Sequence, residues 1–260
     1  MKISILLPFK ENYSANYAGA VSLFVNDTIN QSIFKNSIRV FGNTDYKNFL
    51  STKYTNIEFK KKLFSSTNKL YVEKFLNIEN KINSDLIEIH NRPSYVSIIR
   101  KKYHKLLFLF LHNDPLQMNG SRSVDDRINL LQNVDKIIFN SEWCRQRFFE
   151  NFENKSEYLD KTDLCYQSTS KIKIDFNKKK KIISFVGKLN KAKGYDIFGK
   201  TIIKILDKYP DWTANVFGDE PREKLIFKHK NLHLFGFKNN QYILNHLKKV
   251  SISIACSRWE

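Results

Sequence analysis

Short apolar runs alternate with helical patterns along this chain, and the alternation occurs twice. Residues 2–7 form a near-continuous apolar run, which is typical of a strand buried on both faces, and a helical pattern follows at residues 20–29. The pattern restarts with an apolar run at residues 182–186 and a helical pattern at residues 195–208. Strands that are joined through helices lie parallel in one sheet. The sequence therefore predicts an α/β protein with two doubly wound units.

The remaining patterns complete these two units. Further strands are predicted at residues 37–41, 56–59, 85–89, 106–111, 136–139, 163–166, 213–217, 232–235 and 251–255. Further helices are predicted at residues 67–82, 94–101, 124–132, 142–149 and 241–249, with Ser141 as the N-cap of the fourth of these. The junction falls near residues 172–180, so the predicted domains are residues 1–175 and 180–260. About 80 residues follow the junction, whereas such a domain usually takes about 100 to 150, and we expect the second domain to be incomplete.

Composition and charge limit the classes of protein that fit this pattern. Hydrophobic residues make up 42% of the 260 residues, which is enough to bury a sizeable core and argues against disorder. The formal net charge of +18 favours an anionic partner, namely nucleic acid, a phospholipid surface or a phosphorylated small molecule. Dispersed lysines are also typical of an ordinary solvated surface. The chain has no helix-turn-helix, zinc-finger or RRM-like aromatic signature, so a nucleic-acid-binding protein is the less favoured interpretation.

Neither a membrane span nor a cysteine framework is indicated. No apolar stretch approaches the roughly 20 residues that cross a bilayer, and the apolar opening of the chain is too short for a secretory signal peptide. We therefore expect a cytoplasmic protein. Cys144, Cys165 and Cys256 are widely spaced and odd in number, so neither a disulfide framework nor a metal site is predicted.

The loop after the strand predicted at residues 182–186 has the composition of a phosphate-binding loop. Ligands of open parallel sheets collect where strands end and helices begin. Gly187 would let the backbone approach a ligand, and Lys188 and Lys193 would supply positive charge against phosphate oxygens. Gly194 would permit a tight entry into the helix. The loop matches neither the Walker motif nor Gly-x-Gly-x-x-Gly, and an ordinary turn with surface lysines is the alternative interpretation.

Two further strand ends in this half also lack bulky side chains. One strand runs into Gly218 and Asp219, and the next runs into Gly236 and Phe237. This series of loops resembles, in order and spacing, the donor domain of glycosyltransferase family 4. That family shows Val-Gly-Arg or Val-Gly-Lys, then Lys-Gly, a Val-x-Gly-Asp-Gly-like strand end and a Phe-x-Gly strand. The resemblance implies a GT-B fold with two Rossmann-like domains, the second of them incomplete here. It also implies an enzyme that needs neither a cofactor nor a metal.

The end of the chain resembles the start of another segment of that family. Ser257-Arg258-Trp259-Glu260 matches the beginning of Pro-Ser-x-x-Glu-Pro-Phe-Gly, which opens a pair of acids. Cys256 stands where the family commonly has Pro, and Glu220-Pro221 replaces Gly-Pro. Both departures bear on the identity of the donor more than on the fold.

The resemblance also implies which residues form the site. Those expected to bind the donor are Gly19, Gly187, Lys188, Lys193, Gly218, Gly236 and Phe237. Those expected to be catalytic are His112, His90 and Glu260, because each histidine directly follows a predicted strand on the ligand-facing edge and the glutamate belongs to the acidic segment. Asn140 ranks below the histidines.

The implied reaction is transfer of a sugar, with retention of configuration, from a nucleoside diphosphate sugar to a hydroxyl acceptor. Bacterial cell-surface polysaccharide or lipopolysaccharide synthesis is the expected pathway, with a sugar or lipid-linked acceptor and peripheral contact with the inner face of the membrane. The main alternative is a noncatalytic remnant or interaction module that keeps the fold without turnover.

Overall fold

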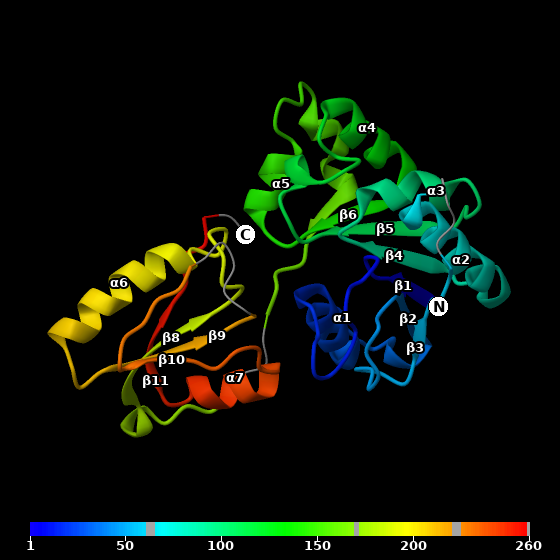
Figure 1. Cartoon of the computed structure of the whole chain (residues 1–260). Helices are drawn as coiled ribbons and strands as arrows, with labels where there is room; N and C mark the ends of the chain where they lie inside the picture. The colour runs from blue at the N-terminus through cyan, green and yellow to red at the C-terminus, as the bar shows by residue number, and fades with distance from the viewer. Residues whose placement is uncertain (61–65, 169–171, 220–224, 259–260) are drawn as a thin grey trace. The chain divides into compact units, whose positions relative to one another are not determined.

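A computed structural model describes residues 1–60, 66–168, 172–219 and 225–258 (Figure 1). The chain divides into two compact units, Met1–Thr169 and Ser170–Glu260. Each unit has its own parallel sheet. Within the described ranges, no helix has the length and apolar character needed to cross a membrane.

The first unit contains a seven-stranded parallel sheet in the order β3-β2-β1-β4-β5-β6-β7. Its strands are β1 (Ile3–Leu6), β2 (Ile38–Gly42), β3 (Tyr54–Asn56), β4 (Leu86–His90), β5 (Leu106–Leu111), β6 (Lys136–Phe139) and β7 (Thr162–Leu164). The chain winds outward from β1 to β3 and then returns to β4 on the other side of β1. The strand order therefore reverses between β1 and β4, which is where open α/β sheets bind ligands at the carboxyl ends of their strands.

Helices cover both faces of this sheet. They are α1 (Ala20–Gln31), α2 (Thr67–Ile82), α3 (Val96–Arg100), α4 (Val124–Asn133) and α5 (Glu142–Phe148), with short 3-10 helices η1 (Lys35–Ser37), η2 (Pro93–Tyr95), η3 (Pro115–Gln117) and η4 (Lys155–Lys161). Successive strand residues point to opposite faces, so Ile5 packs in the core that includes Val25 of α1, whereas Leu6 packs in the larger core that includes Phe75 of α2. Both faces of β1 are therefore buried.

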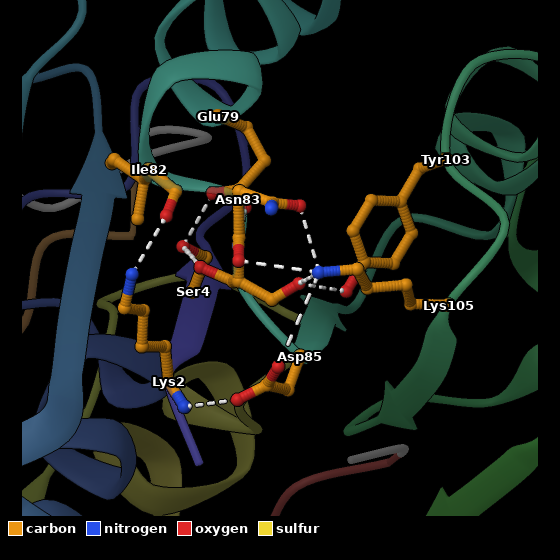
Figure 2. A network of polar contacts seen from close by, with 9 residues as sticks. Lys2, Ser4, Glu79, Ile82, Asn83, Asp85, Tyr103 and Lys105 are labelled. Carbon is orange, nitrogen blue, oxygen red and sulfur yellow. Dashed lines mark hydrogen bonds and ion pairs between the residues drawn. The ribbon is translucent and has the colours of Figure 1, made fainter.

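A buried carboxylate ties α2 to the amino ends of two strands (Figure 2). Glu79 is only 1% exposed. Its carboxylate accepts hydrogen bonds from the Ser4 hydroxyl at 2.5 Å and from the Ser84 backbone N–H at 2.7 Å. The hydroxyls of the two serines lie 2.7 Å apart, and the Tyr103 hydroxyl donates to the Ser84 carbonyl at 3.0 Å. A buried polar group without hydrogen-bond partners would be costly at this depth, and the Ser4 hydroxyl and the Ser84 N–H supply partners for the Glu79 side chain.

The second unit has a four-stranded parallel sheet in the order β10-β9-β8-β11. Its elements are η5 (Phe176–Lys178), β8 (Lys180–Val186), α6 (Tyr195–Lys208), β9 (Thr213–Phe217), β10 (Leu232–Leu234), α7 (Asn240–Leu247) and β11 (Val250–Ile254). The apolar residues Phe198 and Ile202 of α6 are four apart, so they lie on one face of the helix and pack in the core with Phe185 of β8. On the other face of the sheet, Phe217 packs edge-on against His246 of α7, with ring centroids 4.7 Å apart.

The α/β class and the two Rossmann-like sheets are as predicted, and several predicted elements coincide with observed ones. Helices Thr67–Ile82 and Tyr195–Lys208 and strand Leu106–Leu111 have the predicted bounds. Ser141 is the N-cap of α5 and accepts a hydrogen bond from the Cys144 backbone N–H. The strand predicted at residues 56–59 is wrong: β3 lies at Tyr54–Asn56, and only these three residues pair with β2.

Candidate functional site

A pocket of about 250 Å³ lies at the carboxyl ends of β8 and β9 in the second unit. Its lining residues are Val186, Gly187, Lys188, Phe217, Gly218, Asp219, Phe237, Lys238 and Ile243. Four of them were predicted from the sequence to bind a donor: Gly187, Lys188, Gly218 and Phe237. The structure therefore brings these four together around one cavity, although their roles stay predictions.

Glycine is required at the wall of this pocket because two loops touch there. The Gly187 N–H donates to the Phe217 carbonyl at 2.9 Å, and the Gly218 N–H donates to the Gly236 carbonyl at 3.1 Å. A Cβ on Gly218 would overlap the Gly187 carbonyl oxygen and press on Leu189. The missing side chain is what lets the end of β9 lie against the end of β8.

The other predicted donor-site residues of this unit lie beside the pocket. Lys193 is not part of the lining, but its Cβ lies 3.8 Å from where a Cβ on Gly187 would be. Gly236 precedes Phe237 with φ +67, a conformation that favours glycine, and a Cβ there would have nothing within 4 Å. Phe237 exposes 47% of its surface.

The contact between the two loops gives a first prediction. Replacing Gly218 by Ala should lower the free energy of unfolding by about 2 kcal/mol, because the new methyl group must push two backbones apart. The same displacement should open the pocket wall and weaken the binding of a nucleoside diphosphate. Urea unfolding and calorimetric titration with UDP and GDP measure the two effects. Gly236→Ala is the matched control: its Cβ meets no atom, so only the backbone strain of a positive φ should appear. Equal behaviour of the two variants would contradict the role given to the contact.

The segment after β11 is fastened to the loop that enters α6. The guanidinium of Arg258 makes two hydrogen bonds of 2.8 Å to the carboxylate of Asp196, and this pairing lowers the pKa of Asp196 to about 2. The Arg258 backbone N–H donates to the Ala192 carbonyl at 3.0 Å. Gly194 has φ +70, and a Cβ there would overlap the Cys256 carbonyl oxygen. The predicted catalytic Glu260 lies outside the described residues, but Arg258 sits at the start of the helix that follows Lys188 and Lys193.

In the first unit, the two predicted histidines form one hydrogen-bonded pair. His90 ends β4 and His112 directly follows β5. The Nδ1 atom of His90 lies 3.0 Å from the Nε2 atom of His112. The strand register explains this contact: His90 pairs with Phe110, so a side chain two residues further along β5 comes out on the same face of the sheet.

Surrounding side chains hold the pair in place. The Phe110 ring stacks on His90 at 4.5 Å, and Phe24 of α1 packs edge-on against His112 at 4.9 Å. The side-chain amide of Gln167 lies 3.2 Å from the Nδ1 atom of His112. The Asn140 amide donates to the His112 carbonyl at 2.9 Å, so it supports the loop that carries His112. Asn140 is the residue that ranked below the two histidines as a site candidate in the sequence analysis.

Burial fixes the protonation state of this pair. His90 is 1% and His112 is 7% exposed. Burial lowers the pKa of His90 to about 3; burial, with repulsion from His90, lowers the pKa of His112 to about 3 as well. Both rings are therefore neutral near pH 7, and one must donate to the other. Among the described residues, the Nε2 atom of His90 has no hydrogen-bond partner.

Glu88 faces this Nε2 atom from two positions earlier in β4. One of its carboxylate oxygens lies 3.6 Å from the Nε2 atom. Burial raises the pKa of Glu88 to about 7. Sequence reasoning missed Glu88 and Gln167, although the spacing of Glu88 and His90 in a strand already places them on the same face of the sheet. The chain of side chains Glu88, His90, His112 and Gln167 can hold a fixed pattern of protons at the sheet edge.

Gly19, the remaining predicted donor-site residue, is the N-cap of α1. A Cβ there would overlap the carboxylate of Glu11, and one oxygen of this carboxylate accepts a hydrogen bond from the Ser22 backbone N–H at 3.1 Å. The space that the glycine leaves is thus used by a carboxylate that caps the helix. The approach of a ligand to Gly19 stays a prediction.

Comparisons with known proteins bear on both units. Residues 167–260 match the family model of glycosyl transferases group 1. "Putative glycosyltransferase YtcC" from Bacillus subtilis (strain 168) is 28% identical over 153 residues, which cover 52% of this chain and 37% of that protein. The chain therefore spans little more than a third of the length of this curated relative.

Solved structures share the fold of the chain. Sucrose-phosphate synthase from Thermosynechococcus elongatus matches with a TM-score of 0.74 at 13% identity, over 100% of this chain and 76% of that one. Anabaena Alr3699/HepE, in a crystal structure with UDP and glucose, matches with a TM-score of 0.66 at 15% identity, over 99% of this chain and 74% of that one. The predicted fold, two Rossmann-like domains of the GT-B type, is confirmed by these likenesses.

Proposed function

We propose that the protein transfers a sugar from a nucleoside diphosphate sugar to a hydroxyl acceptor, because residues 167–260 match the family model of glycosyl transferases group 1. The observation that carries this proposal is the pocket at the ends of β8 and β9, where Gly187, Lys188, Gly218 and Phe237 meet. It lies within the segment that the family model matches. The solved structure of Anabaena Alr3699/HepE with UDP and glucose supports a donor of this class.

The pocket offers what a diphosphate needs. The two glycines keep side chains off the cavity wall, Lys188 supplies a positive charge, and α6 begins a few residues further on. A helix start carries a partial positive charge that favours anions. Phe237 provides an apolar, half-exposed surface for the flat part of a ligand. Stabilisation of the departing diphosphate by these groups would be the largest catalytic contribution.

The histidine pair is proposed to contact the reacting sugar or the acceptor. Near pH 7 both rings are neutral, so each can accept a hydrogen bond from a hydroxyl or donate one to it. His112 is the more exposed of the two and would contact a ligand by exchanging its hydrogen bond to Gln167, whereas His90 orients it. Glu260 is retained as a proposed catalytic acid on the resemblance alone. Retention of configuration is proposed on the same ground.

Replacement of Lys188 tests the donor site. Lys188→Ala should weaken the binding of UDP or GDP about tenfold and slow sugar transfer by at least as much, because one charge-assisted contact to phosphate is lost. The melting temperature should stay the same, since Lys188 is exposed. Lys200→Ala, an exposed lysine on α6 of the same unit, is the control and should change neither quantity. Calorimetric titration and detection of released UDP or GDP measure the effects; parallel losses of activity and melting temperature would contradict the role.

Two finer parts of the proposal concern place and partners. Synthesis of a bacterial cell-surface polysaccharide or lipopolysaccharide is the proposed pathway, with a lipid-linked or sugar acceptor at the inner face of the membrane. The noncatalytic alternative makes a different prediction: nucleotide binding without release of UDP or GDP from any donor and acceptor pair. One assay of donor turnover therefore separates the two.

A further inference from the structure

A second and larger pocket of the second unit lies at the opposite end of its sheet from the proposed donor pocket. It has a volume of about 890 Å³ and lies where β8 and β11 begin. Its lining residues, which we call the lysine groove, are Lys173, Asp175, Asn177, Lys178, Lys179, Lys180, Asn245, Lys248 and Lys249. Six of these nine side chains are lysines and one is acidic, so the groove is strongly positive near neutral pH.

Internal contacts leave most of this charge available. Lys179 donates to the carbonyls of Leu247 and Val250, which fixes the groove to the end of α7. The only acidic lining residue, Asp175, lies 3.5 Å from Lys178, and the side chains of this pair are 49% and 80% exposed. An ion pair so exposed contributes little.

Apolar side chains stand beside these lysines on the same segment. Phe176 is 79% exposed and Ile174 is 40% exposed. Burying a phenylalanine side chain is worth about 1.5–3 kcal/mol, so the largely exposed Phe176 is a site where a partner with an apolar interior would gain binding energy. Lysines interleaved with exposed apolar residues are typical of surfaces that enter the headgroup region of a membrane.

The groove is separate from the proposed donor site. β8 has seven residues and runs from Lys180, at the groove, to Val186, at the pocket. At about 3.3 Å per residue the two lie roughly 20 Å apart. A ligand in the groove would therefore leave the pocket open.

We propose that the lysine groove, together with Ile174 and Phe176, docks the second unit onto a bilayer surface rich in anionic lipid headgroups. Each lysine close to such a surface contributes attraction of about 1 kcal/mol, and the two apolar side chains enter the interface. Nucleic acid would satisfy the lysines but would give Ile174 no apolar partner. The inference rests on the proposed function in one respect: docking would be useful because the proposed acceptor is carried by a lipid.

Sedimentation of the full chain with vesicles tests the docking surface without any measurement of transfer. The chain should sediment with vesicles of phosphatidylcholine mixed with phosphatidylglycerol and stay in solution with phosphatidylcholine alone. The triple variant Lys178→Glu/Lys180→Glu/Lys248→Glu should reduce the bound fraction about tenfold or more. The control Lys69→Glu/Lys101→Glu/Lys155→Glu changes three exposed lysines of the first unit by the same net charge and should bind nearly as the unchanged chain does.

Phe176→Ser should weaken binding to the mixed vesicles several-fold and should make the remaining binding more sensitive to salt, because only the electrostatic part is left. Titration with UDP or GDP should be unchanged in these variants, which shows that the fold of the second unit is intact and separates this inference from the donor site. Equal losses in the two triple variants, or tighter binding to duplex DNA than to mixed vesicles, would overturn the proposal, as would full binding by Phe176→Ser.

Discussion

At pH 5 the first unit should be about 2 kcal/mol less stable than at pH 7, and replacing Glu88 by Gln should double that loss. His90 and His112 have folded pKa values of about 3, below the ordinary 6.5. Their contribution to stability is therefore present above pH 6.5 and is lost as the pH falls toward 3. The reason is that over this pH range the histidines bind protons in the unfolded chain but stay neutral in the folded chain. When the pH falls from 7 to 5, each histidine lowers the free energy of unfolding by about 2 kcal/mol.

Glu88 acts in the opposite direction. Its folded pKa of about 7 is raised from 4.5, so its contribution is fully present below pH 4.5 and is lost as the pH rises through 7. When the pH falls from 7 to 5, Glu88 raises the free energy of unfolding by about 2 kcal/mol, which offsets half of the decrease caused by the two histidines. Glu88→Gln removes this offset, so the loss becomes about 4 kcal/mol.

Hydrogen exchange of the β4 and β5 amides in the full chain measures this stability, and comparison of variants at one pH cancels the intrinsic exchange rates. The double variant His90→Gln/His112→Gln is the control. It keeps side chains that can hydrogen-bond but do not titrate, and its stability should not fall between pH 7 and pH 5. If Glu88→Gln showed the same pH dependence as the unchanged chain, the raised pKa of Glu88 in the folded state would be wrong.

The second large effect concerns the buried carboxylate of Figure 2. Glu79→Ala should lower the free energy of unfolding by about 3 kcal/mol, because it leaves a cavity and deprives the Ser84 N–H of its acceptor. Glu79→Gln should cost only about 1 kcal/mol, because the amide oxygen can accept from Ser84 while the Ser4 hydroxyl turns to accept from the amide.

Urea unfolding measures both variants. If the free energy of unfolding falls with urea concentration at the same slope in both, the shift between their midpoints gives the difference in stability. A similar loss in both would mean that the charge itself, rather than the filled and satisfied site, stabilises this corner of the sheet. A loss below about 1 kcal/mol for Glu79→Ala would mean that water replaces the carboxylate without penalty.

Elements with strong periodicity and clear caps could be predicted from the sequence. The helix Thr67–Ile82 begins at Ser66, whose hydroxyl accepts a hydrogen bond from the Lys69 N–H, and ends at Asn83 with φ +53. Both signals are local. The strand β3 was misplaced because its pairing with β2, which involves three residues, depends on a contact between segments far apart in the sequence. The 3-10 helix η4 lies in a polar stretch without periodicity, so no local pattern indicated it.

The candidate site divides in the same way. Gly187, Lys188, Gly218 and Phe237 follow strands, and the topology of a parallel sheet brings such loops to one edge, so their meeting at one pocket could be expected. The hydrogen bond between His90 and His112 could not, because it depends on the register of β4 against β5 and on the packing of Phe24 and Phe110 against the two rings. Glu88 carried no local signal beyond its spacing from His90.

The strand order of the second unit has a consequence for how the chain folds during synthesis. β8 forms its sheet with β9 on one side, but its other neighbour is β11, whose residues are made about 65 positions later. Until Val250–Ile254 leave the ribosome, one edge of β8 has unpaired N–H and C=O groups that invite pairing with other chains. Interruption of translation before residue 250 should therefore produce an aggregating product, whereas the first unit, whose seven strands are complete by Leu164, can fold while the second is still being made.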